Sequence, residues 1–121
     1  MASYDRIDRI SQEVHKALDE IIRYDLRDPR IDGTWSIVRC EVTRDLRYCK
    51  ARISILEADK RKDMMAALDK ASGFVRRELG RRVDLRYTPE ILFELDTNIE
   101  YAAHINELLK ETQRHDEAGD D

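Results

Sequence analysis

The sequence predicts an α+β domain of two layers, in which helices pack on one face of a three-stranded sheet. Three observations support this fold class. A long apolar repeat at helical spacing comes first, three short segments alternate apolar with polar residues, and helical sequence separates the second of these segments from the third. The predicted order is helix, strand, strand, helix, helix, strand, helix, and 121 residues suit a single domain.

The first helix is predicted over residues 4–26, because apolar residues recur there every three or four positions. These residues are Ile7, Ile10, Val14, Leu18 and Ile21. The pair Asp28-Pro29 ends the helix, since a residue that precedes proline disfavours the α conformation. The apolar face of this helix is expected to cover the domain's own sheet, so we expect a monomer.

Two strands are predicted at residues 35–43 and 48–56, joined by a turn at Arg44-Asp45. In the first strand, Val38, Cys40 and Val42 alternate with polar residues and are expected to face the core. The expected pairing places Cys40 opposite Cys49. Two small reduced thiols in the core are the favoured interpretation, and a disulfide or a redox switch is the alternative.

Helical sequence follows from residue 61 to residue 83, and Gly73 interrupts it. Glycine inside a helix costs about 1 kcal/mol relative to alanine, and Ser-Gly pairs are common sites of helix kinks. The segment Ala71, Ser72 and Gly73 is therefore predicted to be a kink between two helices.

The third strand is predicted at residues 91–96, where apolar and polar residues alternate again. Thr97 and Glu100 have the spacing of a capping box, which begins a last helix. We expect residues 1–112 to form the domain and residues 113–121 to form an acidic, disordered tail.

Charge is distributed unevenly along the chain, although the net charge is only −4. Residues 36–87 contain 14 basic and 8 acidic side chains, whereas residues 88–121 contain 2 basic and 10 acidic ones. A basic central region of this kind is typical of a nucleic-acid-binding surface, and the alternative is a solvated basic face.

The sequence contains none of the motifs that mark common enzyme classes. It has no HExxH, no GxSxG and no GxxxxGK phosphate loop, and its two cysteines do not have metal-ligand spacing. We therefore expect no catalytic activity, no cofactor and no metal. The longest apolar run is five residues, and the first ten residues lack the apolar region of a secretory signal, so we expect a cytoplasmic protein without membrane association.

The candidate RNA-binding residues are lysines and arginines of the central region, which could neutralise phosphates and release counterions. They are Arg44, Arg47, Lys50, Arg52, Lys60, Arg61, Lys62, Lys70, Arg76, Arg77, Arg81 and Arg82. For Arg76 the alternative is an ion pair with Glu78 or Asp69. Gly73 lies among the candidates and could let a nucleic-acid backbone approach closely. Trp35 and Tyr48 could stack on bases, although aromatic residues beside strands more often pack in the core.

The order of elements looks like a type II KH domain, in which a GxxG loop between paired helices clamps the nucleic-acid backbone. This chain has Ala71-Ser72-Gly73, an AxG, at that junction. With this substitution, the chain resembles the bacterial ribosome-binding factor A family along nearly its whole length. The segments that carry the resemblance are RDPRI at 27–31, VTRDLRYCKARISIL at 42–56, ASGFVRREL at 71–79, LRYTPEILFELD at 85–96 and HINELL at 104–109.

The resemblance implies a non-enzymatic assembly factor. Such a factor would bind 16S rRNA on the free, immature small (30S) ribosomal subunit, assist processing of the 16S rRNA 5′ end and late maturation, and support growth in the cold. A ribosome-maturation GTPase would promote its release. Two other functions fit the same residues: a KH-like protein that binds another RNA, and a protein-interaction module that uses the acidic C-terminal third.

Overall fold

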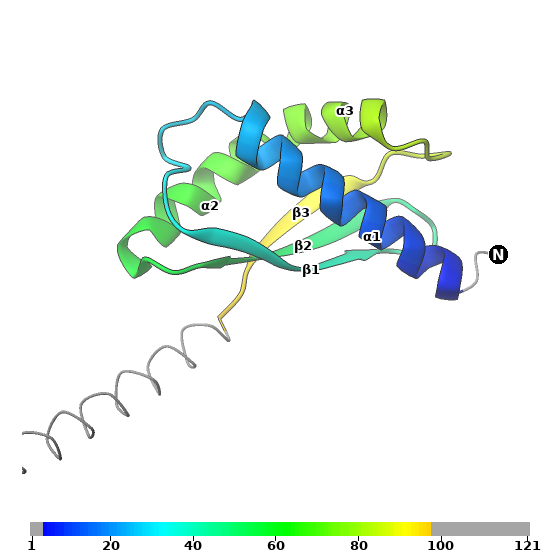
Figure 1. The fold of residues 1–121 in the computed structure, drawn as a ribbon, viewed down its shortest axis with the longest axis horizontal. Coiled ribbons are helices and arrows are strands. Elements are labelled where there is room, and N and C mark those ends of the chain that lie inside the picture. The colour runs from blue at the N-terminus through cyan, green and yellow to red at the C-terminus, as the bar shows by residue number, and fades with distance from the viewer. Residues whose placement is uncertain (1–3, 98–121) are drawn as a thin grey trace, which may run out of the picture.

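The computed structural model describes residues 4–97, and they form a layer of helices on one face of a three-stranded sheet (Figure 1). The elements are α1 (Tyr4–Glu20), η1 (Ile21–Asp25), β1 (Trp35–Val42), β2 (Tyr48–Ile55), η2 (Ala58–Lys60), α2 (Arg61–Lys70), α3 (Ser72–Arg82) and β3 (Glu90–Leu95). Their order confirms the predicted order as far as the third strand. The predicted last helix and the predicted tail lie outside the described residues.

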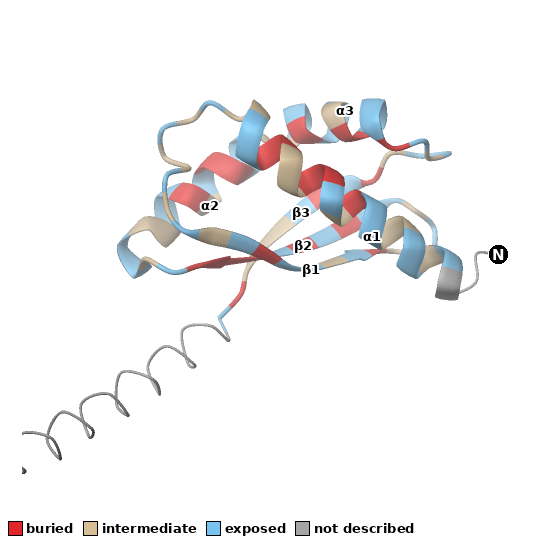
Figure 2. Cartoon of the chain, viewed as in Figure 1, coloured by how far each residue is buried: buried red, intermediate tan, exposed pale blue. Residues whose placement is uncertain are grey.

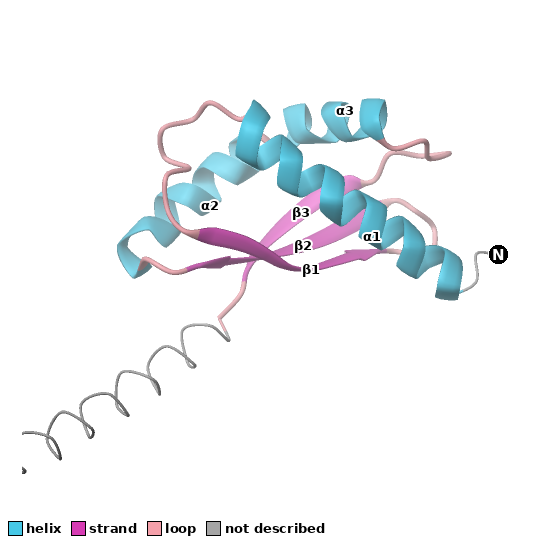
Figure 3. Cartoon of the chain, in the orientation of Figure 1, coloured by secondary structure: helices cyan, strands magenta, loops and turns pink. Residues whose placement is uncertain are grey.

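The sheet has the strand order β1-β2-β3, with β1 antiparallel to β2 and β2 parallel to β3. A parallel pair needs a crossover connection, and α2 and α3 supply it here. Figure 3 shows that this crossover and α1 lie on the same side of the sheet, which confirms the two-layer α+β prediction. The opposite face of the sheet carries no helix among residues 4–97.

The helix predicted over residues 4–26 is found, but its last turn is wider than an α-helical turn. The segment η1 is a π-helix, in which the backbone N–H of Leu26 donates to the carbonyl oxygen of Ile21 over 3.1 Å. Ile21 and Ile22 are both buried, whereas Arg23 and Tyr24 are exposed. The π turn is a local irregularity that the three- and four-residue apolar repeat could not reveal.

A bulge in β1 overturns the expectation that Val38 faces the core. The pairing register shifts between Ile37 and Arg39, so Ile37 is buried and Val38 is 52% exposed. A bulge adds one residue to one strand. The residues before the bulge therefore point to the opposite face of the sheet from the one that simple alternation predicts.

The expected pairing of Cys40 with Cys49 is wrong by two residues, because Cys40 lies opposite Ala51 and Cys49 lies opposite Val42. The two thiols nevertheless lie on the same face of the sheet, and their Sγ atoms are 3.1 Å apart. Both cysteines are free. The hydrogen bond to Cys40, reinforced by burial, raises the pKa of the Cys49 thiol above its ordinary value.

The helical segment predicted from residue 61 to residue 83 is divided, as expected for a kink. The break lies at Ala71, where φ is −86° and ψ is −1°, and Gly73 already belongs to the first turn of α3. The predicted kink at Ala71, Ser72 and Gly73 is therefore confirmed, with its centre two residues before the glycine.

The core lies between the two layers, where the facing sides of helices and sheet are buried (Figure 2). Its largest fully buried side chains include Leu18 and Ile21 from the first helical segment, Ile53 and Ile55 from β2, and Leu79 from α3. No helix between residues 4 and 97 has the length and apolar character needed to cross a membrane.

Candidate nucleic-acid interface

The structure does not gather the predicted basic residues into one patch. One group lies in the β1–β2 turn and on the open face of the sheet, a second lies where α2 begins, and a third lies along the junction of α2 with α3 and on α3. The members of each group differ in how far their charges are already used by the protein itself.

Lys50 and Arg52 lie on the open face of the sheet, because they alternate along β2 with the buried residues Cys49, Ala51 and Ile53. Nη2 of Arg52 is 3.9 Å from Oε2 of Glu94 on the neighbouring strand.

The turn between β1 and β2 holds the other two candidates of this group, Arg44 and Arg47. Both are exposed, and Nε of Arg47 lies 3.9 Å from Oδ2 of Asp45 in the same turn. Ion pairs between solvent-exposed groups at this separation contribute little, because water and salt screen them, so the charge of Arg47 stays available.

At the start of α2, only one of the three predicted RNA-binding residues makes no polar contact with a described residue. Nε of Arg61 donates to the carbonyl oxygen of Ile55 over 2.9 Å, so this guanidinium ties the helix to the end of β2. Nζ of Lys60 lies 3.4 Å from Oδ2 of Asp32. Lys62 is exposed and forms no salt bridge with a described residue.

Two arginines of α3 act as structural residues. Arg76 donates from Nε and Nη2 to the carbonyl oxygen of Thr88, over 3.2 and 3.1 Å, and forms no salt bridge with Glu78 or Asp69. Arg82 is bound by Asp25 of η1 and lies 3.5 Å from Oε2 of Glu20. These contacts hold α3 against the loop before β3 on one side and against α1 and η1 on the other.

The remaining basic residues of α3 point to solvent. Gly73, Arg77 and Arg81 follow one another at helical spacing on the exposed side of the helix, opposite the buried Val75 and Leu79. Arg77 forms no salt bridge with any residue between 4 and 97, and Arg81 is 78% exposed despite a 3.5 Å contact with Glu78. We call Gly73, Arg77 and Arg81 the α3 outer face.

Gly73 has open space where a side chain would begin, because a Cβ atom added there would meet nothing within 4 Å. Its φ is not positive, so its backbone conformation does not require glycine. At Gly33, by contrast, an added Cβ would lie 2.8 Å from Oε2 of Glu57 and 2.9 Å from Sδ of Met64. Packing within the protein thus accounts for a glycine at position 33 but not for a glycine at position 73.

Comparisons with known proteins identify the family of the chain. The ribosome-binding factor A family model matches residues 6–109 of the chain. The chain belongs to the ribosome-binding factor A family. It is 53% identical over 120 residues to ribosome-binding factor A of Clostridium novyi. The alignment covers 96% of this chain and 98% of that protein.

A crystal structure and a fitted homology model from the ribosome-binding factor A family share the fold at lower identity. The crystal structure of the Thermus thermophilus protein has a TM-score of 0.66 and is 21% identical, over 74% of this chain and 93% of that one. A homology model of the Thermus thermophilus protein, fitted into the cryo-EM map of a 30S–RbfA complex, has a TM-score of 0.61 at 21% identity over the same shares.

The sequence patterns do not single out two residues that the structure brings beside Lys70. Arg27 comes from the loop after η1, and Phe74 comes from the first turn of α3; both line one hollow with Lys70. Arg27 lies in the RDPRI segment and Phe74 in the ASGFVRREL segment, both of which carry the family resemblance, but neither composition nor periodicity assigns these residues a role.

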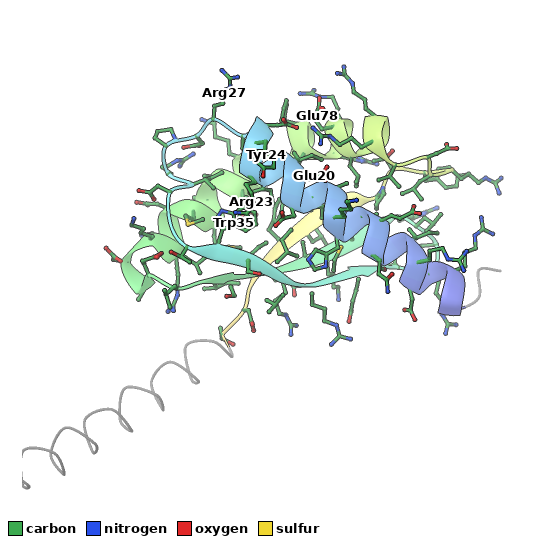
Figure 4. All side chains as sticks on the ribbon, viewed as in Figure 1. Glu20, Arg23, Tyr24, Arg27, Trp35 and Glu78 are labelled. Carbon is green, nitrogen blue, oxygen red and sulfur yellow. The ribbon has the colours of Figure 1, made fainter. Side chains whose placement is uncertain are left out.

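The aromatic residues considered from sequence differ in their surroundings. Trp35 is half-buried against the core, and the guanidinium of Arg23 lies over its ring at 4.6 Å from the centroid. Figure 4 shows Arg23 between Tyr24 and Trp35 at the end of the first helical segment. Trp35 is thus engaged within the protein, whereas Tyr48 is 43% exposed.

Proposed function

We propose that this chain binds the immature small (30S) ribosomal subunit through its 16S rRNA and assists 5′-end processing and late maturation without catalysing a reaction. Membership of the ribosome-binding factor A family is the observation that carries the proposal. A relative of the same fold fitted into a map of a 30S complex supports the choice of the small subunit as the partner.

The α3 outer face, with Lys70 at its beginning, is the proposed centre of the RNA contact. Neither Arg77 nor Lys70 forms a salt bridge with a described residue, so both can bind phosphates without breaking a salt bridge of the protein. Each phosphate that these side chains neutralise releases condensed counterions, which favours association. Open space over Gly73 gives the sugar-phosphate backbone room to approach the helix.

The other predicted cations have secondary roles in this proposal. Arg76, Arg82 and Arg61 position α2 and α3, and their substitution would weaken binding through the fold. Release of the chain from the mature subunit by a ribosome-maturation GTPase completes the proposed cycle. The chain acts as a monomer in this proposal, because the apolar faces of its helices are already buried against one face of its own sheet.

Sedimentation of cell lysate through a density gradient tests the function. The wild-type chain is expected to migrate with free small subunits at low salt and to be missing from assembled ribosomes and polysomes. Arg77→Glu on the α3 outer face is expected to shift the protein toward the top of the gradient at moderate salt.

A matched control is Lys16→Glu, which reverses one exposed charge on α1, an element that holds none of the candidate RNA-binding residues. It is expected to sediment like the wild type. If the wild-type chain stays at the top of the gradient even at low salt and in cold-grown cells, the proposed function is wrong.

A further inference from the structure

A shallow hollow of about 630 Å³ lies between the loop that follows η1 and the junction of α2 with α3. Its lining includes Arg27 and Arg30 from the loop and Lys70 and Phe74 from the junction. The hollow adjoins the α3 outer face, because Gly73 immediately precedes Phe74 in the first turn of α3.

Both acidic residues that line the hollow are already bound by arginines. Oδ2 of Asp28 lies 2.8 Å from Nη2 of Arg30, and Oδ1 accepts the backbone N–H of Arg30 over 3.0 Å. Asp25 is bound by Arg82 of α3. The hydrogen bonds from Arg30 lower the pKa of Asp28 to about 2, so this carboxylate is ionised and paired at neutral pH.

Arg27 and Lys70 are the two cations of the hollow that form no salt bridge with any residue between 4 and 97. Both side chains are exposed. Figure 4 shows Arg27 extending outward from the loop after η1. The lining carries three cations, Arg27, Arg30 and Lys70, and two carboxylates, Asp25 and Asp28, so the hollow has a net charge of +1. The Lys70 ammonium also attracts the Asp28 carboxylate, although Arg30 binds that carboxylate directly. A phosphate is the ligand group that this pair of cations would neutralise.

Phe74 adds an aromatic surface beside these cations. Its side chain is 37% exposed and lies outside the main apolar core. On α3 it occupies the side turned toward α1, one turn before Glu78 and two turns before Arg82. An accessible ring next to unpaired cations is the combination with which proteins bind single-stranded nucleic acid, since bases stack on the ring and phosphates meet the charges.

We propose that this hollow binds one nucleotide of single-stranded RNA, with the base stacked on Phe74 and the phosphate held by Arg27 and Lys70. The proposal rests on the proposed function in that it takes RNA as the ligand, and it adds a second contact beside the α3 outer face. The ligand is a single strand because the bases of a duplex are already stacked on one another and cannot cover the ring. The strand would leave the hollow over Gly73 and continue toward Arg77.

Fluorescence anisotropy of labelled single-stranded oligouridylate with the full chain tests the proposal. Phe74→Leu keeps an apolar side chain but removes the ring, and it is expected to weaken binding roughly 5- to 150-fold without changing the salt dependence. Arg27→Gln and Lys70→Gln are each expected to reduce the slope of log affinity against log salt by about 0.7, the loss of one phosphate contact.

Tyr48→Leu is the matched aromatic control, and Lys16→Gln is the matched charge control; both are expected to bind oligouridylate like the wild type. Thermal melts establish that each variant folds. Equal losses for Phe74→Leu and Tyr48→Leu, or wild-type affinity in all three hollow variants, would overturn the proposal. Binding of polyglutamate that is as tight as RNA binding and independent of Phe74 would mark the site as an acceptor for acidic protein, which also overturns it.

The outcome for the hollow is separable from the outcome for the proposed function. If the wild type migrates with small subunits while the hollow variants bind RNA normally, the hollow alone is excluded. If the hollow variants lose RNA binding while the wild type ignores small subunits, the hollow is supported as an RNA site and the role in subunit maturation is excluded.

Discussion

At the scale of single residues, the glycines separate the requirements of folding from those of binding. At Gly33 an added Cβ would press against the side-chain ends of Glu57 and Met64, and the Glu57 carboxylate accepts the backbone N–H of Thr34 over 2.7 Å. That hydrogen bond lowers the pKa of Glu57, so the contact is made by the ionised carboxylate. Gly73 has no such neighbour, although glycine in a helix is less favourable than alanine.

Gly73→Ala is expected to raise the free energy of unfolding by up to about 1 kcal/mol, because alanine has the higher helix propensity and the space is open. Gly73→Val is expected to fold but to weaken RNA binding more than it changes stability. Urea denaturation and small-subunit pull-down measure the two effects separately.

Gly33→Ala serves as the control for this pair. It is expected to lower the free energy of unfolding by about 1 kcal/mol, because the ends of the Glu57 and Met64 side chains must move, with normal RNA binding by the folded fraction. Parallel losses of stability and binding in Gly73→Val would reduce Gly73 to a packing residue.

At the scale of elements, α3 is held mainly by its apolar face. Val75 and Leu79 are fully buried, whereas the ion pairs of Arg82 with Glu20 and Asp25 are partly exposed to solvent. Partly exposed ion pairs contribute little, while removal of a buried leucine side chain leaves a cavity. The arginine contacts therefore set the orientation of α3 more than they set the stability of the domain.

Leu79→Ala is expected to lower the free energy of unfolding by about 2–5 kcal/mol. Arg82→Gln is expected to lower it by less than about 1 kcal/mol. Urea denaturation followed by circular dichroism compares the two variants. A larger loss in Arg82→Gln would mean that the ion pairs, not the apolar face, attach α3 to the domain.

At the scale of the whole molecule, the basic residues occupy two opposite sides. Lys50 and Arg52 lie on the open face of the sheet, and the α3 outer face lies on the far side of the helical layer. One short strand of RNA cannot contact both sides without wrapping around an edge of the domain.

The double variant Arg77→Gln/Arg81→Gln is expected to reduce the slope of log affinity against log salt by about 1.4, as two phosphate contacts are lost. Lys50→Gln/Arg52→Gln removes the same charge from the open face of the sheet and is expected to leave the slope unchanged. Anisotropy titrations at several salt concentrations measure both. Equal reductions would show that RNA reaches the sheet side as well.

The predicted elements agree with the observed ones because their signals are local. The repeat of Val14, Leu18 and Ile21 reports the period of a helix, and the alternation in β2 reports the period of a strand. The predictions that failed concern strand pairing, which is not a local property of the sequence. The bulge between Ile37 and Arg39 reverses the facing of the β1 residues that precede it, and the register of the hairpin places Cys40 and Cys49 diagonally. Both depend on how the neighbouring strand is paired.

The sequence by itself therefore determined the order of elements, the two-layer class, the AxG junction and the family. Only the tertiary structure decided which cations are available to a partner. Arg76 donates to the carbonyl oxygen of Thr88, and Arg82 forms a salt bridge with Asp25. Asp28, beside Arg27, forms a salt bridge with Arg30. Several of these contacts join residues that are distant in the chain, and charge availability depends on distances that composition and periodicity do not encode.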